Sequence, residues 1–202
     1  MSNQIAAPPA HDDADQVQAA QRGDVAAFEF LVRTHQKAML NVAYRLTGVY
    51  EDACDVVQDA FLIAWRKLGD FRSEARFSTW LTSIVINQSR NRLKQMRQQE
   101  RRHAHSLDAP IAGHDDPPSA TTDGTPSVLE LLEEVELRRA LQRCIEALTP
   151  EFREVLVLRD MREMSYEDVG ASLNLREGTV KSRLFRARDA VKNCLKRAVV
   201  TT

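Results

Sequence analysis

Apolar side chains recur along most of this chain at the three- and four-residue spacing of an amphipathic helix. Gly48 and Gly69 are expected to end the second and third helices of the first half, because glycine readily adopts the left-handed backbone conformation found at helix ends. No alternating run of β-branched residues is present, so we expect an all-α fold. Three to five helices are predicted between residues 16 and 105, with apolar faces that include Phe28, Leu31, Val32, His35, Met39, Val42, Ala43, Leu46, Val57, Phe61, Ala64 and Leu68.

A second helical block begins at Val128. Its apolar face carries Leu131, Leu132, Val135, Leu141, Cys144, Ile145 and Leu148. A further helix is predicted to follow, with Thr149 as the N-cap, Pro150 at the first helical position and Glu151 near the positive end of the helix dipole.

The segment after Met164 has the pattern of a helix-turn-helix unit. Ser165 and Asp168 form a predicted capping box, in which Ser165 accepts from the third helical amide and Asp168 reaches back to the cap. The first helix is expected to end at Leu173, and Asn174 suits a left-handed turn. A second helix is expected from about Arg176, with Val180, Leu184, Ala187 and Val191 on its buried stripe.

Composition divides the chain into two small helical domains. Residues 1–15 and 198–202 are expected to be tails, residues 16–105 the first domain and 128–197 the second. The linker at 106–127 holds four of the seven prolines, four aspartates and no aromatic residue. Its 22 residues could span up to roughly 75 Å when fully extended.

Composition and charge exclude several classes of protein. Hydrophobic residues make up 43% of the chain and charged residues 28%, and the longest uncharged stretch, residues 77–89, is too short and too polar to cross a bilayer. Residues 1–15 lack the basic and apolar regions of a secretory signal, so a cytoplasmic protein is expected. Three cysteines, none in a C-x-x-C pair, favour neither a disulfide framework nor a zinc knuckle, and indicate a reducing compartment.

The net charge of −1 conceals two basic segments. Residues 84–105 hold six basic side chains and one acid, and residues 176–197 hold eight and two, whereas residues 106–137 hold eight acids and no Lys or Arg. Two polyanion-binding surfaces joined by an acidic connection are therefore expected.

Both basic segments carry candidate nucleic-acid contacts. Trp80 shares one predicted helix face with Asn87 and Asn91, so an indole and an amide could hold an unpaired base beside the basic run. The alternative is that Trp80 is a core residue and Asn87 a surface one; Phe61, Trp65 and Phe77 are interpreted as core. On the second helix of the helix-turn-helix unit, the outward side chains are Arg176, Thr179, Lys181, Ser182, Arg183 and Arg186.

Three motifs together resemble a bacterial sigma factor of the extracytoplasmic-function class, group 4 of the sigma-70 family. They are Asp55-Val-Val-Gln-Asp-Ala-Phe61-Leu-Ile-Ala-Trp65, Phe77-Ser-Thr-Trp80-Leu with Asn87, and Met164-Ser-Tyr-Glu-Asp-Val169 through Gly178-Thr-Val-Lys-Ser-Arg-Leu-Phe-Arg-Ala-Arg188. They occur in the order of that family over about 180 residues. The resemblance implies two domains, sigma regions 2 and 4, joined by a flexible linker.

The resemblance also implies partners and roles. Asp55, Gln58, Asp59 and Leu62 would grip the β′ clamp of core RNA polymerase, although by themselves they describe the wet face of an ordinary amphipathic helix. The -10 promoter element would be opened and read by Trp80, Asn87, Arg90, Asn91, Arg92 and Lys94, and the -35 element by the helix from Arg176. Region 4 would contact the β flap, and an anti-sigma factor would hold the protein at the inner membrane without membrane insertion of the chain itself.

No pattern for catalysis, a cofactor or a metal is found. The chain has no glycine-rich phosphate loop and no nucleophile motif, and His103, His105 and His114 lack neighbouring cysteines or paired carboxylates. A non-enzyme is therefore expected. Two other functions stay open: a sigma-like decoy that titrates an anti-sigma factor, and an ordinary helix-turn-helix regulator. The basic helix argues against the decoy, and the lack of a dimerisation or ligand domain argues against the regulator.

Overall fold

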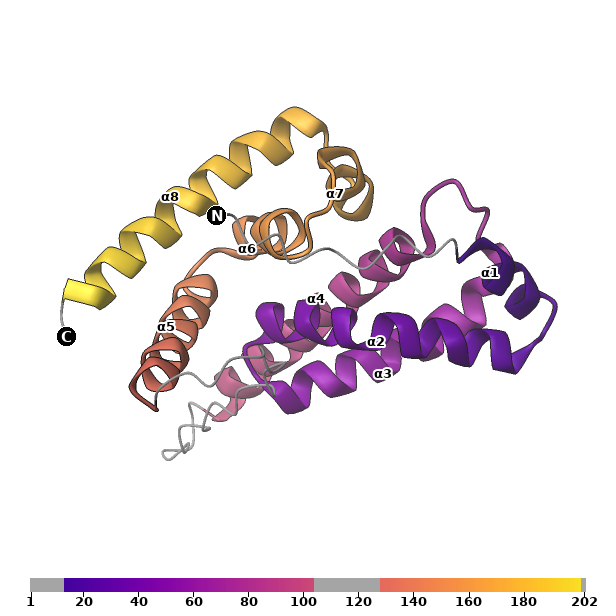
Figure 1. The fold of residues 1–202 in the computed structure, drawn as a ribbon, viewed down its shortest axis with the longest axis horizontal. Helices are drawn as coiled ribbons and strands as arrows, with labels where there is room; N and C mark the ends of the chain where they lie inside the picture. Colours follow the sequence, from indigo (N-terminus) through magenta and orange to yellow (C-terminus); the bar gives the residue numbers. More distant parts are fainter. Residues whose placement is uncertain (1–12, 104–127, 201–202) are drawn as a thin grey trace.

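The computed structural model describes residues 13–103 and 128–200, and within them every regular element is a helix. An N-terminal bundle contains α1 (Ala14–Gln21), α2 (Val25–Thr47), α3 (Tyr50–Lys67), η1 (Leu68–Asp70) and α4 (Phe77–His103). A C-terminal bundle contains α5 (Val128–Glu146), α6 (Pro150–Leu156), η2 (Val157–Met161), α7 (Tyr166–Leu173) and α8 (Glu177–Val200). Figure 1 shows the two bundles side by side. The all-α prediction is confirmed, and the predicted linker at 106–127 lies outside the described residues.

Local signals explain where the helices of the N-terminal bundle begin and end. The Asp24 carboxylate caps α2 by accepting from the amides of Ala26 and Ala27, at 2.9 and 3.2 Å. Gly48 ends α2 with φ of +81°, in the left-handed region that glycine adopts without strain. A side chain there would also collide with Glu146 of α5, because an added Cβ would lie 2.6 Å from its Oε1.

The helix-turn-helix unit forms as predicted. The Ser165 hydroxyl oxygen accepts a hydrogen bond from the amide of Asp168 at 3.0 Å, as the capping box predicts. The Asp168 carboxylate accepts a hydrogen bond from the Ser165 hydroxyl and not, as predicted, from the Ser165 amide. Asn174 is left-handed with φ of +55° and ends α7 after Leu173. Gly170 permits the tight turn, since a Cβ would meet the carbonyl oxygen of Leu175 at 2.7 Å.

Three local features differ from the sequence predictions. Thr149 occupies the N-cap position of α6, but its side chain makes no capping hydrogen bond. The α6 helix continues directly into the π-helical η2, which no sequence signal indicated. The α8 helix extends to Val200, three residues past the expected end at Arg197.

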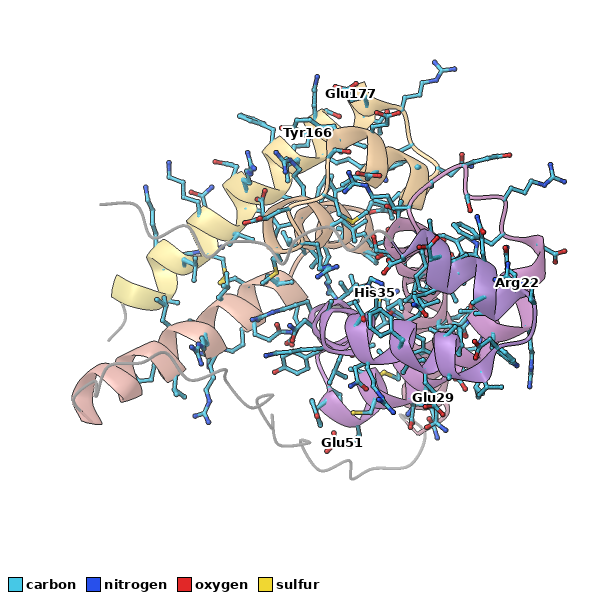
Figure 2. The ribbon with its side chains drawn as sticks, turned by 45° about the vertical axis from the view of Figure 1, so that its right-hand side comes forward. Arg22, Glu29, His35, Glu51, Tyr166 and Glu177 are labelled. Carbon is cyan, nitrogen blue, oxygen red and sulfur yellow. A yellow bond between two sulfur atoms is a disulfide. The ribbon has the colours of Figure 1, made fainter. Side chains whose placement is uncertain are left out.

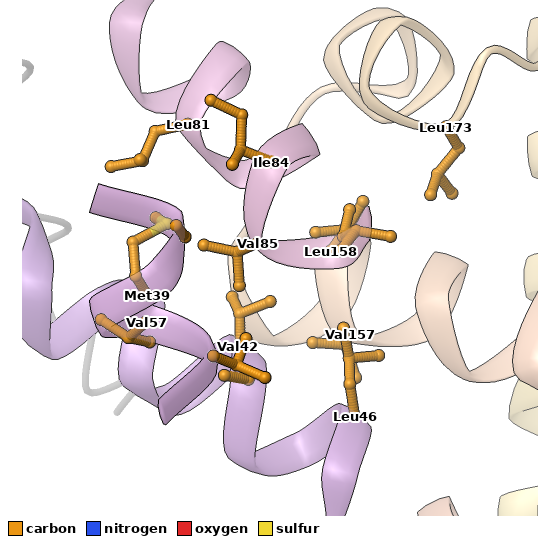
Figure 3. Close-up of a cluster of buried hydrophobic side chains, with 14 of the residues drawn as sticks. Met39, Val42, Leu46, Val57, Leu81, Ile84, Val85, Val157, Leu158 and Leu173 are labelled. Atoms are coloured by element: carbon orange, nitrogen blue, oxygen red, sulfur yellow. The ribbon is translucent and has the colours of Figure 1, made fainter. Parts of the chain in front are cut away.

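One hydrophobic core runs through both bundles. Figure 3 shows Met39, Val42, Leu46, Val57, Leu81, Ile84 and Val85 of the N-terminal bundle in the same cluster as Val157, Leu158 and Leu173 of the C-terminal bundle. The α2 helix contacts α5, α6 and η2, and α4 contacts α7. The bundles therefore pack against each other through apolar side chains, and this packing positions the candidate site. No helix within the described ranges is long and apolar enough to cross a membrane.

Candidate nucleic-acid interface

The predicted -10 residues of α4 divide into an aromatic and a polar part. Trp80 is half-buried, and its ring lies 4.9 Å from that of Phe71 and 5.8 Å from that of Phe77, measured between centroids. Asn87, Arg90, Asn91 and Lys94 are exposed further along the helix. The rings of Phe71 and Phe77 hold the Trp80 indole in place. Trp80 therefore packs against core residues and is still partly accessible to a base, which the sequence analysis had treated as alternatives.

A hollow of about 280 Å³ lies beside Trp80. Its lining residues come from the segment before α4, from α4 itself and from α7: Asp70, Phe71, Arg72, Glu74, Ala75, Thr79, Trp80, Ser83, Ala171 and Ser172. It thus has an aromatic wall, a polar rim and a neighbouring cation, which is the combination that holds an unpaired base.

Two arginines of α4 are already engaged in ion pairs. Arg92 donates to the buried carboxylate of Asp52 on α3, with Nε 2.8 Å from Oδ1. Arg90 forms a two-pronged pair with Glu154 of α6, both N–O distances being 2.6 Å. Hydrogen bonding to Glu154 raises the pKa of Arg90, against the opposing effect of its partial burial. Arg92 therefore stabilises the N-terminal bundle itself, whereas Arg90 bridges the two bundles.

The outward face of α8 carries the predicted -35 residues. Arg176, just before α8, is exposed, as are Lys181, Ser182 and Arg186 on the helix, whereas Thr179 and Arg183 are half-buried. Lys181 pairs with Glu177 one turn before it and lies over the Tyr166 ring of α7, 5.3 Å from its centroid. Hydrogen bonding to Glu177 is the main effect that raises the pKa of Lys181. A cationic helix face is therefore presented at the edge of the C-terminal bundle.

Phe185 is a surface feature that the sequence analysis did not select. It lies on α8 between Arg183 and Arg186 and is 75% exposed, the largest exposure of any big apolar residue described. The helical period could have placed it opposite the buried Leu184 and Ala187. An exposed aromatic ring on a groove-binding helix can contact the methyl group of thymine.

The four predicted polymerase-binding residues are all exposed on α3: Asp55, Gln58, Asp59 and Leu62. Beside them, α2 and α3 enclose an apolar groove of about 760 Å³, lined by Val25, Phe28, Val32, Gln36, Lys37, Leu40, Cys54, Val57, Gln58, Phe61, Leu62 and Trp65. Figure 2 shows Glu29 and Glu51 along the edge of this helix pair, away from Tyr166 and Glu177 of the C-terminal bundle. The groove therefore lies on a face that the C-terminal bundle leaves uncovered.

Two aromatic residues interpreted as core, Phe61 and Phe77, are buried, but Trp65 is not. Trp65 is 37% exposed, and its ring packs against Phe28 at a centroid distance of 4.8 Å, where it lines the groove. Its interpretation as core is wrong, because the ring packs against Phe28 of α2 and also lines the open groove between α2 and α3.

The expectation that the cysteines form no disulfide is wrong for one pair. Cys144 of α5 and Cys194 of α8 are joined by a disulfide, with their Cα atoms 5.7 Å apart, and Cys54 is free and exposed. The partners are 50 positions apart in the sequence, a separation that gave no spacing signal. No cluster of metal-ligating side chains is found in the described ranges.

The disulfide is expected to stabilise the C-terminal bundle. Cys194→Ala should lower the free energy of unfolding by about 2–4 kcal/mol under non-reducing conditions, because the bond restricts the unfolded chain. Urea denaturation followed by circular dichroism measures the change, and titration of free thiols should find one in the untreated protein and three after reduction. The matched variant Cys54→Ala should retain full stability. Equal stability of Cys194→Ala and the parent without reductant would contradict this expectation.

Two family models match separate parts of this chain. Residues 31–100 match the family model Sigma-70 region 2, and residues 138–191 match Sigma-70, region 4. The RNA polymerase sigma-H factor of Pseudomonas aeruginosa is 35% identical over 184 residues, 91% of this chain and 93% of that protein. The ECF RNA polymerase sigma-E factor of Escherichia coli K12 is 36% identical over 178 residues, 88% of this chain and 91% of that protein.

Solved structures of similar proteins share the fold. CnrH, in complex with the cytosolic domain of CnrY, has a TM-score of 0.65 and 28% identity over 92% of this chain and 97% of that chain. The sigma factor RpoE of Bartonella quintana, in complex with the anti-sigma factor NepR, has a TM-score of 0.64 and 26% identity over 85% and 98%.

Sigma-70 region 2 followed by Sigma-70 region 4 defines a promoter-recognition subunit of RNA polymerase. This chain belongs to the sigma-70 family, as an alternative sigma factor of the extracytoplasmic-function class.

Proposed function

We propose that this sigma factor reads the -10 element with α4 and the -35 element with α8 while α3 holds core RNA polymerase. The observation that carries this assignment is the hollow beside Trp80. Trp80 lies on α4, and the same helix carries an exposed run of amide and basic side chains. The chain acts by binding and positioning, and no reaction step is assigned to it. It works in the cytoplasm, where core polymerase and promoter DNA are found.

At the -10 element, Trp80 and Asn87 bracket the unpaired strand. They lie seven residues apart on α4, which is two helical turns and therefore one face. Phe71 and Phe77 fix the indole, so little side-chain entropy is lost when a base stacks on it. Arg90, Asn91 and Lys94 then hold the phosphates of the same strand.

At the -35 element, α8 enters the major groove with its cationic face. Arg176, Lys181 and Arg186 are exposed and can reach phosphates or guanine edges. Thr179, Ser182 and Arg183 lie on the same part of the helix and add hydroxyl and guanidinium donors. Phe185 adds an apolar contact to this set.

Core polymerase binds the exposed face of α3. Asp55, Gln58 and Asp59 supply a polar rim, and Leu62 is an apolar anchor beside the groove, which is the usual anatomy of a protein interface. Region 4 contributes a second contact with the β flap. The RpoE structure contains an anti-sigma factor, which supports an anti-sigma partner for this chain, with tethering at the inner membrane through that partner.

The test is run-off transcription with purified core polymerase. The parent chain should direct initiation from a duplex promoter, whereas a decoy would bind an anti-sigma factor without initiating, and an ordinary regulator would bind DNA without needing core polymerase. Asn87→Ala should bind core polymerase normally but reduce transcription about tenfold or more, corresponding to ~1.4 kcal/mol or more at the opened base.

Premelted templates separate base capture from a fold defect. Asn87→Ala should recover most of its activity on a promoter that is already mismatched around -10, and permanganate footprinting should show a missing bubble on duplex DNA. Asn41→Ala, an exposed amide of α2 outside every hollow described, is the matched control and should behave as the parent. Full opening of duplex DNA by Asn87→Ala would overturn the role of Asn87.

A further inference from the structure

One wall of the hollow beside Trp80 is a short segment without regular secondary structure. Residues 71–76 connect η1 to α4. Four of them line the hollow: Phe71, Arg72, Glu74 and Ala75. Ser73, in the middle of the segment, has a φ of +56°, in the left-handed region that a residue other than glycine adopts only at a cost in free energy. Contacts with the surrounding structure therefore have to maintain the shape of this wall.

The side chain of Gln21, the last residue of α1, makes two hydrogen bonds to the start of the segment. Its Nε2 donates to the carbonyl oxygen of Leu68 at 2.9 Å and to that of Phe71 at 2.8 Å. A primary amide nitrogen carries two hydrogens, so both are used. The Leu68 oxygen also accepts from the amide of Phe71 at 3.1 Å. Gln21 thus fixes the backbone at both ends of the turn that leads into the segment.

The backbone at Phe71 sets the position of a ring that packs on Trp80. The two ring centroids are 4.9 Å apart, with the ring planes inclined by 37°. The Phe71 ring also meets Phe77 edge-on, at a centroid distance of 6.2 Å. A phenylalanine side chain has only two rotatable bonds, so the ring follows a shift of its own backbone. Movement of the Phe71 carbonyl would therefore change the surface against which the Trp80 indole rests.

The start of α1 supports the same aromatic cluster. Asp13, the residue before α1, has its Oδ2 2.9 Å from Nε2 of His35 on α2, and both side chains are mostly buried. The His35 ring packs against Phe77, with 5.5 Å between the centroids. Val17 and Ala20 bury the apolar face of α1 between these two ends, and α1 contacts η1 (Figure 1). The last residue of α1 therefore acts from a fixed support.

We propose that Gln21 is a positioning residue for base capture at the -10 element. By fixing the carbonyls of Leu68 and Phe71, it holds the Phe71 ring against Trp80 and keeps the hollow in the shape that accepts an unpaired base. The proposal rests on the -10 role assigned to Trp80. Gln21 does not line the hollow, so its effect is exerted through Phe71. A wall that is ordered before DNA arrives lowers the entropic cost of stacking a base on it.

The effect on Trp80 can be measured in the free chain without DNA. Trp65→Phe leaves Trp80 as the only tryptophan, and acrylamide quenching of its fluorescence then reports how accessible the indole is. In this background, Gln21→Met keeps an unbranched side chain of similar length but has no N–H donor. It should raise the quenching constant about twofold, because the Phe71 wall loosens. Gln18→Met, at an exposed glutamine of the same helix, is the matched control and should leave the constant unchanged.

A hydrogen-bond donor at position 21 should restore the behaviour of the parent. Gln21→Lys places an ammonium with three N–H donors within reach of the same carbonyls, so the quenching constant should return to the parent value. Acrylamide is uncharged, so the added charge does not itself alter the quenching. An unchanged constant in Gln21→Met, an equal rise in Gln18→Met, or a rise in Gln21→Lys as large as in Gln21→Met would overturn the proposal.

Abasic sites test whether the supported wall serves base capture. Holoenzyme is bound to a premelted promoter in which one base of the -10 non-template strand is removed at a time. For the parent, removal of the captured base should weaken binding about fivefold or more, which is the loss of one stacking contact. Gln21→Met should bind the intact template several-fold more weakly and lose at most about twofold more at that position, because the two changes remove the same contact. Gln18→Met should follow the parent at every position.

The abasic profile separates the role of Gln21 from the role of the hollow. If Gln21→Met has the profile of the parent and is only weaker throughout, the substitution causes a general defect and the role of Gln21 is overturned. A parent profile with no sensitive position would instead overturn base capture in the hollow, which the Asn87→Ala experiment also tests. The quenching result contains no DNA, so it distinguishes these two failures.

Discussion

Arg153→Ala is expected to lower the free energy of unfolding by about 3 kcal/mol or more, one of the largest effects of any single substitution in this chain. Arg153 is 8% exposed. Its guanidinium donates to the carbonyl oxygens of Ile145 at 3.1 Å, Leu148 at 3.2 Å and Leu46 at 2.7 Å, and to that of Glu146. Alanine leaves these buried acceptors at the ends of α5 and α2 without their donor.

Burial also lowers the pKa of Arg153, and Arg97 adds to this effect while the Glu146 carboxylate opposes it. The charged form is retained because four acceptors surround it. Arg153→Lys should recover only part of the stability, since an ammonium has three donors and lacks the planar fork that reaches carbonyls on two bundles.

Urea denaturation followed by circular dichroism measures both variants. Arg143→Ala, an exposed arginine of α5, is the matched control and should change the stability by no more than about 0.5 kcal/mol. A loss below about 1 kcal/mol for Arg153→Ala would mean that water replaces the guanidinium at these carbonyls.

Leu62→Glu is expected to weaken binding to core RNA polymerase at least 100-fold without lowering the stability of the free protein. Leu62 is 48% exposed beside the apolar groove, so a charge there costs little in the free chain. In a complex, the same position would be desolvated, and truncation or charging of a buried interface anchor costs about 2–4 kcal/mol or more.

Fluorescence anisotropy of the labelled chain titrated with core polymerase gives the affinity. Phe30→Glu is the matched control, because Phe30 is a 44% exposed apolar residue of α2 that does not line the groove. Both variants should melt at the same temperature as the parent. Tight binding by Leu62→Glu, or an equal loss for Phe30→Glu, would move the polymerase contact away from this part of α3.

Helix boundaries and the helix-turn-helix unit could be predicted because their signals are local. Asp24, Gly48, Ser165 and Asn174 act on backbone groups within four residues of themselves, and the sequence displays those neighbours directly. The exposure of the α3 stripe and of Lys181 and Arg186 on α8 followed in the same way from the helical period. For these features, every residue that takes part in the interaction lies close by in the sequence.

Contacts between distant residues were decided only by tertiary structure. Arg90 and Glu154 are 64 residues apart, Cys144 and Cys194 are 50 apart, and Arg153 and Leu46 are 107 apart. The helical period predicts which face a side chain occupies, but not which helix packs against that face. The sequence by itself thus determined the helices, the candidate DNA-binding and polymerase-binding residues of the two domains, and the family. The packing of the helices alone decided that Arg90 is paired, that Trp65 is exposed and that two cysteines form a disulfide.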